Sequence, residues 1–361
     1  MSADKPKRTK DDHFTALFET STAVRPFVER WAYANMPSDL QAVIAPSIER
    51  CLARRRDGPL LRPLLTRMCY EVCGGGSWRD VLPILAAVEL LNISTYQSNY
   101  CFDEKAGIAT AERNNQFICS MLSFSVIPAL VESSTTVTTD AKCATIALLA
   151  RSNHEVYQGQ FYDLNILNLD CVSDFSSADA FYNVYAKRCD LIAGSTFRAC
   201  AAGAIVNGLD VPPLQALYRY LGCLGAAAQV VNDLGDYIPH VTKDYALPFS
   251  DLQLGRLTLP TFLLYQGGAP ILEWRHRLRN EAHAPDVESA LAAAIGDLAI
   301  EARARAFIQS RFFEDLRKAL ADLRRYFGDE STQAFRFAYP YIFDSRLLRY
   351  FRADRSRAWP T

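Results

Sequence analysis

Apolar residues recur with helical periodicity through most of the chain, and no segment shows convincing strand-like alternation. The pattern predicts helices near residues 25–34, 38–56, 60–73, 78–103, 112–132, 139–168, 178–207, 212–239, 285–326 and 332–352. Longer loops are expected at 240–257 and 266–284. Residues 1–20 are mostly polar and predict a disordered arm. Residues 21–361 contain no linker or repeat, which predicts an all-α fold with a single helical bundle domain.

Polar residues on two of the most apolar predicted helices fall on one face. Within residues 81–103 they step by three or four positions: Glu89, Asn92, Tyr96, Asn99 and Asp103. Within and just after residues 217–237, one face carries Gln229, Asp233, Asp236 and His240, with Asn232 one turn before Asp236. A polar stripe on a buried helix must meet something polar. A solvated helix face explains either stripe alone equally well.

The two stripes together favour a metal site. Both end in carboxylate and amide oxygens, which are the ligands that Mg²⁺ prefers, and Mg²⁺ is commonly completed by substrate phosphates. The pair therefore predicts a metal–phosphate cleft between two helices. Lys243 and Arg256 bracket Asp251 in the following segment and can hold phosphate oxygens. An ordinary solvated loop is the alternative for that segment.

Composition narrows the classes of function. The net charge is −1 with 22% charged residues, so the chain has no broad basic field and a nucleic-acid partner is not expected. The ten cysteines form no Cys-x-x-Cys pair and the five histidines do not cluster with them, which disfavours zinc. No apolar run reaches the ~18 residues of a membrane span. The N-terminal residues lack the apolar core of a secretory signal, and we expect a cytoplasmic location.

Six segments resemble the polyprenyl synthetases, a family with two DDxxD motifs on facing helices that bind three Mg²⁺ and an allylic prenyl diphosphate. Residues 99–103 and 229–237 resemble those two motifs, and residues 58–63, 159–164, 203–208 and 251–260 resemble four further family motifs. The resemblance implies an isoprenoid synthase fold, a homodimer and Mg²⁺ as cofactor. It implies the metal ligands Asp103, Asp233, Asp236, Asn99 and Asn232. It also implies substrate contacts from Ser94, Thr95, Tyr96, Gln160, Asp163, Gln229 and Lys105, with Lys243 and Arg256 holding the diphosphate.

Several positions depart from the family pattern. Asn99, Tyr100 and Asn232 stand where the family has aspartate, so we expect weaker metal binding. The family's Lys-Thr pair has no counterpart. One turn earlier on the same helix, Lys187 or Arg188 can replace the lost phosphate contact, and a surface role on that helix is the alternative.

The segment at 58–63 has fewer basic residues than the family motif that it resembles. In the family its basic residues bind isopentenyl diphosphate, but here Pro59 and Leu60 stand at two of those positions and Arg62 alone remains. Lys105 is the remnant of a basic pair after the first motif. We therefore expect isopentenyl diphosphate to be a poor second substrate.

Three functions remain open from the sequence. The first is a prenyltransferase that ionises an allylic diphosphate and passes the cation to an acceptor. The second is a class I terpene synthase, in which the cation closes on its own double bonds. The third is a non-catalytic partner subunit of a prenyl diphosphate synthase. Ser94 and Thr95 are small where the family uses bulk to limit chain length, so we expect a C15 or C20 substrate.

Overall fold

The computed structural model describes residues 10–34, 38–53, 60–102, 110–238, 249–281 and 284–335. Across these ranges helices dominate and no strand occurs, apart from an isolated bridge between Asn168 and Arg256. The prediction of an all-α fold is confirmed. The residues form two compact units. The division falls inside helices α7 (Thr139–Phe161) and α11 (Val211–Gly235). The expectation of a single domain stays a prediction.

Unit 1 is built around one long buried helix. Besides the first parts of α7 and α11 and the last part of α17 (Glu314–Phe327), its elements are α1 (Lys10–Ala34), α2 (Ser38–Ala53), α3 (Leu61–Val72), η1 (Trp78–Val81), α4 (Leu82–Phe102), α5 (Thr110–Ser125), α6 (Ile127–Glu132), α9 (Ser195–Arg198), η5 (Ala199–Ala201) and α10 (Ala202–Ile205). Residues 84–95 of α4 are all buried, because α1, α2, α3, α5, α6 and α10 pack against this helix.

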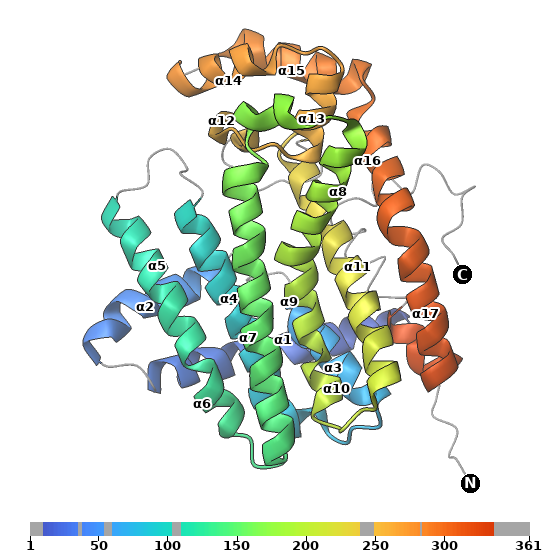
Figure 1. The fold of residues 1–361 in the computed structure, drawn as a ribbon. Coiled ribbons are helices and arrows are strands. Elements are labelled where there is room, and N and C mark those ends of the chain that lie inside the picture. The colour runs from blue at the N-terminus through green and yellow to red at the C-terminus, as the bar shows by residue number, and fades with distance from the viewer. Residues whose placement is uncertain are drawn as a thin grey trace. The chain divides into compact units, whose positions relative to one another are not determined.

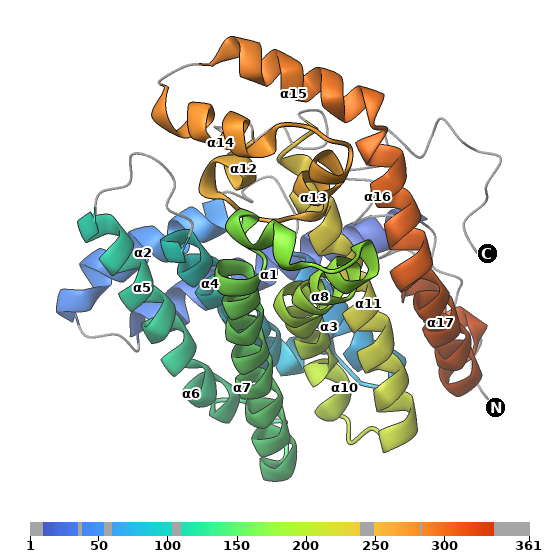
Figure 2. The same ribbon diagram turned by 45° about the horizontal axis from the view of Figure 1, so that its top comes forward.

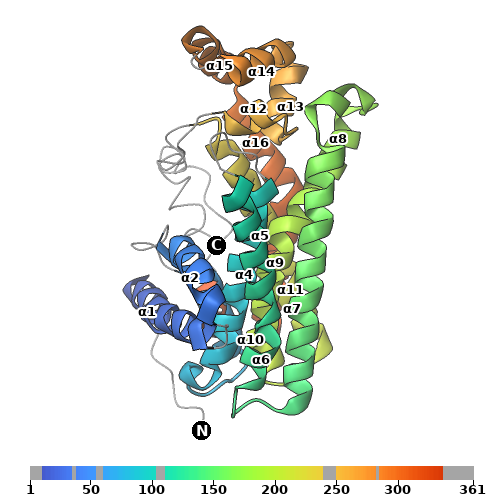
Figure 3. The same ribbon diagram turned by 90° about the vertical axis from the view of Figure 1, so that its left-hand side faces the viewer.

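Small polar residues join α4 to α5, which lie side by side in Figures 1 and 3. The Ser94 hydroxyl donates to the Ser120 carbonyl at 2.9 Å, and the Ser120 hydroxyl donates to the Ser94 carbonyl at 2.8 Å. A second chain of bonds runs from Gln97 to Ser47 and on to Gln116, each at 2.7 Å. These buried polar groups are therefore satisfied within the helix interface.

Helix α1 begins inside the segment that the sequence predicts to be a disordered arm, so residues 10–20 correct that expectation. The physical reason is a buried arginine on α3. Arg67 pairs with Glu19 of α1 at 3.0 Å and with Glu71 at 2.8 Å. Its guanidinium also lies 4.6 Å from the centre of the Trp78 ring. These contacts hold the polar N-terminal segment in place.

Unit 2 contains the remaining elements. They are η2 (Tyr162–Ile166), η3 (Leu169–Asp174), α8 (Ala178–Cys189), η4 (Asp190–Gly194), α12 (Ser250–Leu254), α13 (Leu259–Gln266), α14 (Ile271–Asn280), α15 (Pro285–Asp297), α16 (Ile300–Ile308) and η6 (Gln309–Phe313). Phe181 of α8 stacks on Phe262 of α13, with ring centres 3.7 Å apart. Figure 2 shows α14 beside α15 within this unit.

Two of the long predicted helices are interrupted. The helix predicted at 285–326 breaks at Ala299, which adopts the left-handed conformation (φ 49°) between α15 and α16. The helix predicted at 178–207 contains the π-helical turn η4 and the 3₁₀ turn η5. Helix α14 occupies much of the loop predicted at 266–284. Alanine-rich sequence carries no stop signal at such breaks, so helical periodicity runs through them.

Among the residues that the structure describes, one helical segment is long and apolar enough to cross a membrane. Residues 110–132, which comprise α5 and α6, have a mean hydropathy of 1.2 over the relevant window, of which 39% is buried in the structure. A core helix of a soluble protein can be equally long and apolar, so this is weak evidence for a span.

Gly203 provides a test of helix packing in unit 1. A Cβ atom at Gly203 would lie 2.0 Å from the carbonyl oxygen of Thr66 and 2.9 Å from the backbone nitrogen of Tyr70. Because both atoms are backbone, Gly203→Ala should lower the free energy of unfolding by about 1–3 kcal/mol or more, measured by urea denaturation. Gly296→Ala is the matched control, since its Cβ would meet nothing within 4 Å. It should be neutral or stabilising by up to about 1 kcal/mol. Equal effects of the two substitutions would contradict this packing.

Candidate functional site

The turn η4, which directly follows α8, approaches α11 at backbone contact in unit 2. A Cβ atom at Gly225 of α11 would lie 2.5 Å from the carbonyl oxygen of Ala193. A Cβ atom at Gly194 would lie 3.1 Å from the carbonyl oxygen of Gly222. Side chains at these two glycines would force the helices apart. The close approach allows α8 side chains to reach the polar stripe on α11.

Four charged side chains form one buried group, which we call the Arg188 cluster: Asp163, Arg188, Asp233 and Arg256. Arg188 Nη1 lies 2.7 Å from Asp233 Oδ2, and Arg188 Nη2 lies 2.8 Å from Asp163 Oδ1. Arg256 Nη1 lies 3.2 Å from Asp163 Oδ2. The four residues are 7%, 6%, 3% and 7% exposed, in chain order. The two positive charges offset the two negative charges, and buried charges need such partners because they have lost their contact with water.

Asp233 accepts hydrogen bonds on both carboxylate oxygens. Oδ2 accepts from the Tyr185 hydroxyl at 2.6 Å as well as from Arg188, and Oδ1 accepts from Gln229 Nε2 at 2.8 Å. Burial raises the pKa of Asp233, and the charge of Arg188 opposes that shift. Burial and the neighbouring Asp233 carboxylate raise the pKa of Tyr185 well above its usual value, so this hydroxyl stays protonated.

Arg188 stays charged and keeps one donor unused. Burial would lower its pKa, but the charges of Asp163 and Asp233 outweigh that effect and raise it well above the ordinary value. Its Nε is buried and has no hydrogen-bond acceptor in the part of the chain that the structure describes. A buried guanidinium N–H without an acceptor is costly, so this donor is suited to an oxygen supplied by a ligand.

Asp236, one turn further along the stripe, binds the start of α12. Its Oδ1 accepts from the Ser250 backbone N–H at 3.1 Å and from the Ser250 hydroxyl at 2.7 Å. Its Oδ2 accepts from the Asp251 backbone N–H at 2.8 Å. The carboxylate therefore satisfies two backbone donors that the first turn of a helix leaves unpaired.

The second stripe, as it stands, does not fit a divalent cation. Both oxygens of Asp233 and both oxygens of Asp236 already accept hydrogen bonds from protein donors. The described residues contain no group of three His, Cys, Asp or Glu placed to hold a metal. Asn232 is partly exposed and has interactions of its own. A cation at this stripe would have to bind beside the guanidinium of Arg188 and compete with the donors at the start of α12.

The first stripe lies on α4 in unit 1. Glu89 and Asn92 are buried together, with Asn92 Nδ2 donating to Glu89 Oε1 at 3.1 Å. Asn99 is partly exposed at the end of the helix. Asp103, Lys105, His240 and Lys243 lie outside the described residues. The expected convergence of the two stripes on one metal stays a prediction.

The residues predicted to set chain length are mostly engaged in helix packing. Ser94 bonds to α5, as described above, and the Thr95 hydroxyl donates to the Asn92 carbonyl at 3.0 Å. Both side chains are buried, whereas Tyr96 is exposed. Their predicted role in the substrate cavity stays a prediction. Gln160, one turn before Asp163, is buried in unit 2.

The segment expected to bind a second diphosphate, residues 58–63, is described from residue 60 onward. Its one basic side chain there, Arg62, is engaged within the protein. The Arg62 guanidinium donates to the Thr196 hydroxyl at 3.1 Å and lies 5.0 Å from the centre of the Phe197 ring. Leu60 is fully buried. On α8, Lys187 is exposed, with its Nζ 4.9 Å from the centre of the Tyr162 ring, so only Arg188 of that pair joins the cluster.

Tyr185, which binds Asp233 of the Arg188 cluster, was not identified from the sequence. It lies one turn before Arg188 on α8, so the i, i+3 spacing could have indicated it. Its hydroxyl is the shortest contact of Asp233.

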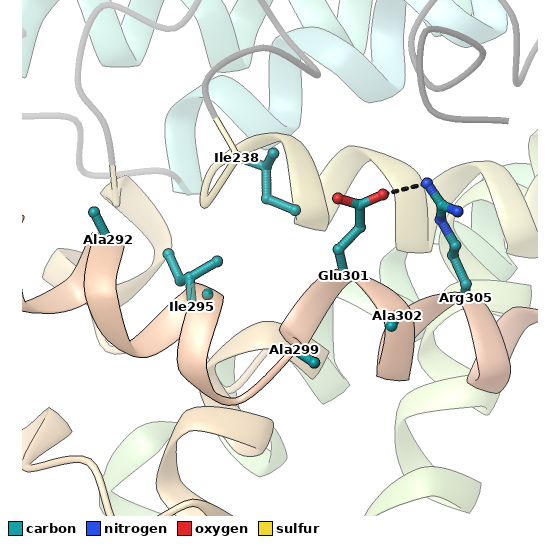
Figure 4. Close-up of a pocket in the computed structure, with 8 residues that line it drawn as sticks. Ile238, Ala292, Ile295, Ala299, Glu301, Ala302 and Arg305 are labelled. Carbon is teal, nitrogen blue, oxygen red and sulfur yellow. Dashed lines mark hydrogen bonds and ion pairs between the residues drawn. The ribbon is translucent and has the colours of Figure 1, made fainter. Parts of the chain in front are cut away.

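Unit 2 also contains a cavity of about 440 Å³ beyond the end of α11 (Figure 4). Its walls come from Ile238 and from α15, α16 and the turn between them: Ala292, Ile295, Gly296, Ala299, Glu301, Ala302 and Arg305. The walls are mainly small and apolar, and the ion pair of Glu301 with Arg305 supplies the polar edge. No residue of the Arg188 cluster lines this cavity, so the two features are separate.

The Tyr185 hydroxyl bond can be tested by itself. Tyr185→Phe removes one charge-assisted hydrogen bond from Asp233 and should lower the free energy of unfolding by about 1.5–3 kcal/mol, measured by urea denaturation. Tyr182→Phe on the same helix is the matched control. It keeps the ring contacts of Tyr182 with Phe262 and Phe307 and should change stability little. If both substitutions have the same effect, Tyr185 does not stabilise Asp233 as described.

Several solved structures that resemble this chain are named as polyprenyl or prenyl diphosphate synthases. A polyprenyl synthase from Caulobacter crescentus, complexed with calcium and isoprenyl diphosphate, is 23% identical over 95% of this chain and 99% of its own (TM-score 0.70). A geranylgeranyl pyrophosphate synthetase from Pyrococcus horikoshii is 18% identical over 92% and 98% (TM-score 0.70). A decaprenyl diphosphate synthase from Rhodobacter capsulatus is 20% identical over 91% and 99% (TM-score 0.64). At these identities the likeness shows the fold.

The family follows from the sequence match. Comparison with curated protein sequences gave no match. The sequence profile described as polyprenyl synthetase matches residues 101–294, which is more than half of the 361-residue chain and includes the Arg188 cluster. The chain therefore belongs to the polyprenyl synthetase family.

Proposed function

We propose that this protein is a prenyltransferase of isoprenoid biosynthesis that binds an allylic prenyl diphosphate beside Arg188. One observation carries the proposal: the Nε–H of Arg188 is buried and lacks an acceptor among the described residues, in a cluster whose other charged contacts are paired. A phosphate oxygen is the acceptor that a guanidinium prefers. In a polyprenyl synthetase the substrate that brings such an oxygen is a prenyl diphosphate.

The proposed reaction breaks the bond between C1 of the prenyl group and the diphosphate oxygen. The bonding electron pair leaves with the diphosphate, and an allylic cation remains. The acceptor then donates an electron pair to C1 and loses a proton. Arg188 and Arg256 supply positive charge beside the departing group. Lys243, outside the described residues, is proposed to add a further cation.

The acceptor is proposed to be something other than isopentenyl diphosphate. A free diphosphate needs several fixed cations, because each charge-assisted hydrogen bond contributes only about 1.5–3 kcal/mol. Arg62 already bonds Thr196 and stacks on Phe197, and Leu60 is fully buried. An apolar acceptor suits these surroundings better than a second diphosphate.

The remaining expectations belong to the same proposal. A C15 or C20 substrate is proposed from the small Ser94 and Thr95. Divalent metal dependence is proposed through the first motif, with Asn99 and Asp103, since the second stripe does not fit a cation as it stands. A cytoplasmic location stays a prediction.

A second function is favoured by a specific observation. Asp233 and Asp236 are both fully engaged within the protein, as a purely structural pair of aspartates would be. A non-catalytic partner subunit of an active synthase has no need of free acidic ligands. The unused Arg188 donor argues against this function, because a structural cluster gains nothing from it.

A homodimer is proposed through the exposed face of α5. Phe117, Ile118 and Met121 are 44%, 47% and 51% exposed and share one face of this helix. Adjacent exposed apolar side chains of this size mark interaction surfaces. A second copy of the chain presents the same apolar face, which suits a two-fold interface.

The substrate prediction concerns purified protein incubated with geranyl, farnesyl or geranylgeranyl diphosphate and Mg²⁺, with and without isopentenyl diphosphate. We expect turnover of the C15 or C20 substrate and no efficient elongation, read by mass spectrometry. The Kd of isopentenyl diphosphate should be higher by roughly two to four powers of ten than the Kd at a site that has two more basic side chains in contact with the diphosphate. Efficient elongation at micromolar isopentenyl diphosphate would overturn this proposal.

The remaining outcomes of that assay separate the alternatives. A hydrocarbon or alcohol formed from the allylic substrate alone indicates a terpene synthase. Activity that appears only when a second synthase is added indicates a partner subunit.

The dimer prediction uses two exposed residues of α5. Phe117→Arg combined with Met121→Arg places like charges opposite each other and should halve the molecular mass measured by light scattering. Leu272→Arg on α14 is the matched control, because Leu272 is an equally exposed apolar residue (52%) on another helix and its change should leave the mass unaltered. A wild-type chain that is monomeric but binds lipid vesicles through this face would indicate a membrane contact instead.

A further inference from the structure

We infer that Arg188 is a built-in cation that takes the place of a divalent metal at the second acidic motif. A metal at such a motif joins carboxylates of the protein to phosphate oxygens of the substrate. Arg188 already joins two carboxylates, Asp163 and Asp233, at 2.8 and 2.7 Å. Its Nε–H, buried and without an acceptor among the described residues, is left for the phosphate.

The charges of the cluster support this role. Asp163 and Asp233 carry two negative charges, and Arg188 with Arg256 carries two positive charges. A divalent cation added to this balanced group would gain little attraction and would have to enter beside a guanidinium that cannot lose its proton. Arg188 cannot move away cheaply, because Asp233 would then keep only the neutral donors Tyr185 and Gln229, and Asp163 would keep only Arg256 as a cation.

Asp236 cannot supply the missing ligand either. Its two oxygens bind Ser250 and Asp251 at the start of α12. A metal at this carboxylate would compete with two backbone N–H groups and the Ser250 hydroxyl for the same oxygens. Protein donors therefore bind both aspartates of the second motif. Arg188, Tyr185 and Gln229 bind Asp233, and the start of α12 binds Asp236.

This inference rests on the proposed function in one respect, namely that the ligand of Arg188 is a diphosphate. It concerns metal binding, so it is measured on the full chain without a prenyl substrate. Mn²⁺ bound per chain is determined by equilibrium dialysis against Mn²⁺, with and without inorganic pyrophosphate. The number of Mn²⁺ ions bound can therefore contradict this inference without affecting the proposed prenyl transfer. Absence of prenyl transfer, in turn, does not change the number of ions bound.

The decisive comparison is between the wild-type chain and Asp233→Asn. We expect the two proteins to bind the same number of Mn²⁺ ions in both conditions, because Asp233 holds Arg188 and not metal. Loss of one ion in Asp233→Asn would overturn the inference, because Asp233 would then be a metal ligand. Folding of each variant is checked by circular dichroism.

A gain of metal binding provides the second test. Arg188→Gln removes the cation and leaves Asp163 and Asp233 facing each other, so it should bind one more Mn²⁺ per chain than wild type. The double variant Arg188→Gln with Asp233→Asn should return to the wild-type count. Arg188→Lys keeps the charge and should also match wild type. An extra ion in Arg188→Lys, or none in a folded Arg188→Gln, would contradict the inference.

A matched control addresses the general effect of losing a buried arginine. Arg67, like Arg188, is 6% exposed and bridges two carboxylates. Arg67→Gln should keep the wild-type count of Mn²⁺, because Arg79 still pairs with Glu19 at 2.7 Å. A gain of Mn²⁺ in Arg67→Gln equal to that in Arg188→Gln would show that the effect is not specific to the acidic motif.

Discussion

The buried guanidinium of Arg188 is the interaction on which the polar centre of unit 2 depends. It neutralises Asp163 from η2 and Asp233 from α11, two carboxylates that could not remain charged in an apolar interior alone. Removing one partner of such a buried group is strongly destabilising, by about 3–5 kcal/mol. The apolar α11 can therefore carry an acidic motif because α8 supplies the counter-charge.

Irregular helical turns accompany this arrangement. Asp163 lies in the π-helical turn η2, and a second π-helical turn, η4, begins directly after α8. A π-helical turn inserts an extra residue and changes which face the following side chains occupy, and such turns are frequent at functional sites. At η4 the chain also passes within backbone contact of Gly225. The geometry of the cluster thus combines two local distortions with one close helix approach.

The sequence predicts the fold class and much of this cluster, because helical periodicity and the stripe on α11 are local patterns. Asp233 was singled out from spacing along one helix, as a metal ligand, and Arg188 was one of two candidates, with Lys187, from the resemblance to the family; these roles stay predictions. Asp236 as the cap of α12 was not predicted, because that role depends on where Ser250 returns in space. The break at Ala299 was missed for a related reason: an alanine in the left-handed conformation is imposed by packing and leaves no trace in composition.

The bonds between Asp236 and the start of α12 fix the two ends of the segment between them. The Asp236 side chain holds Ser250 and Asp251, and its carbonyl accepts from the Phe249 N–H at 3.1 Å. One side chain and one carbonyl of Asp236 thus hold three successive residues, so the end of α11 and the start of α12 are fixed to each other. A substitution at Asp236 would disturb both helices at once, although the residue belongs to only one stripe of the sequence.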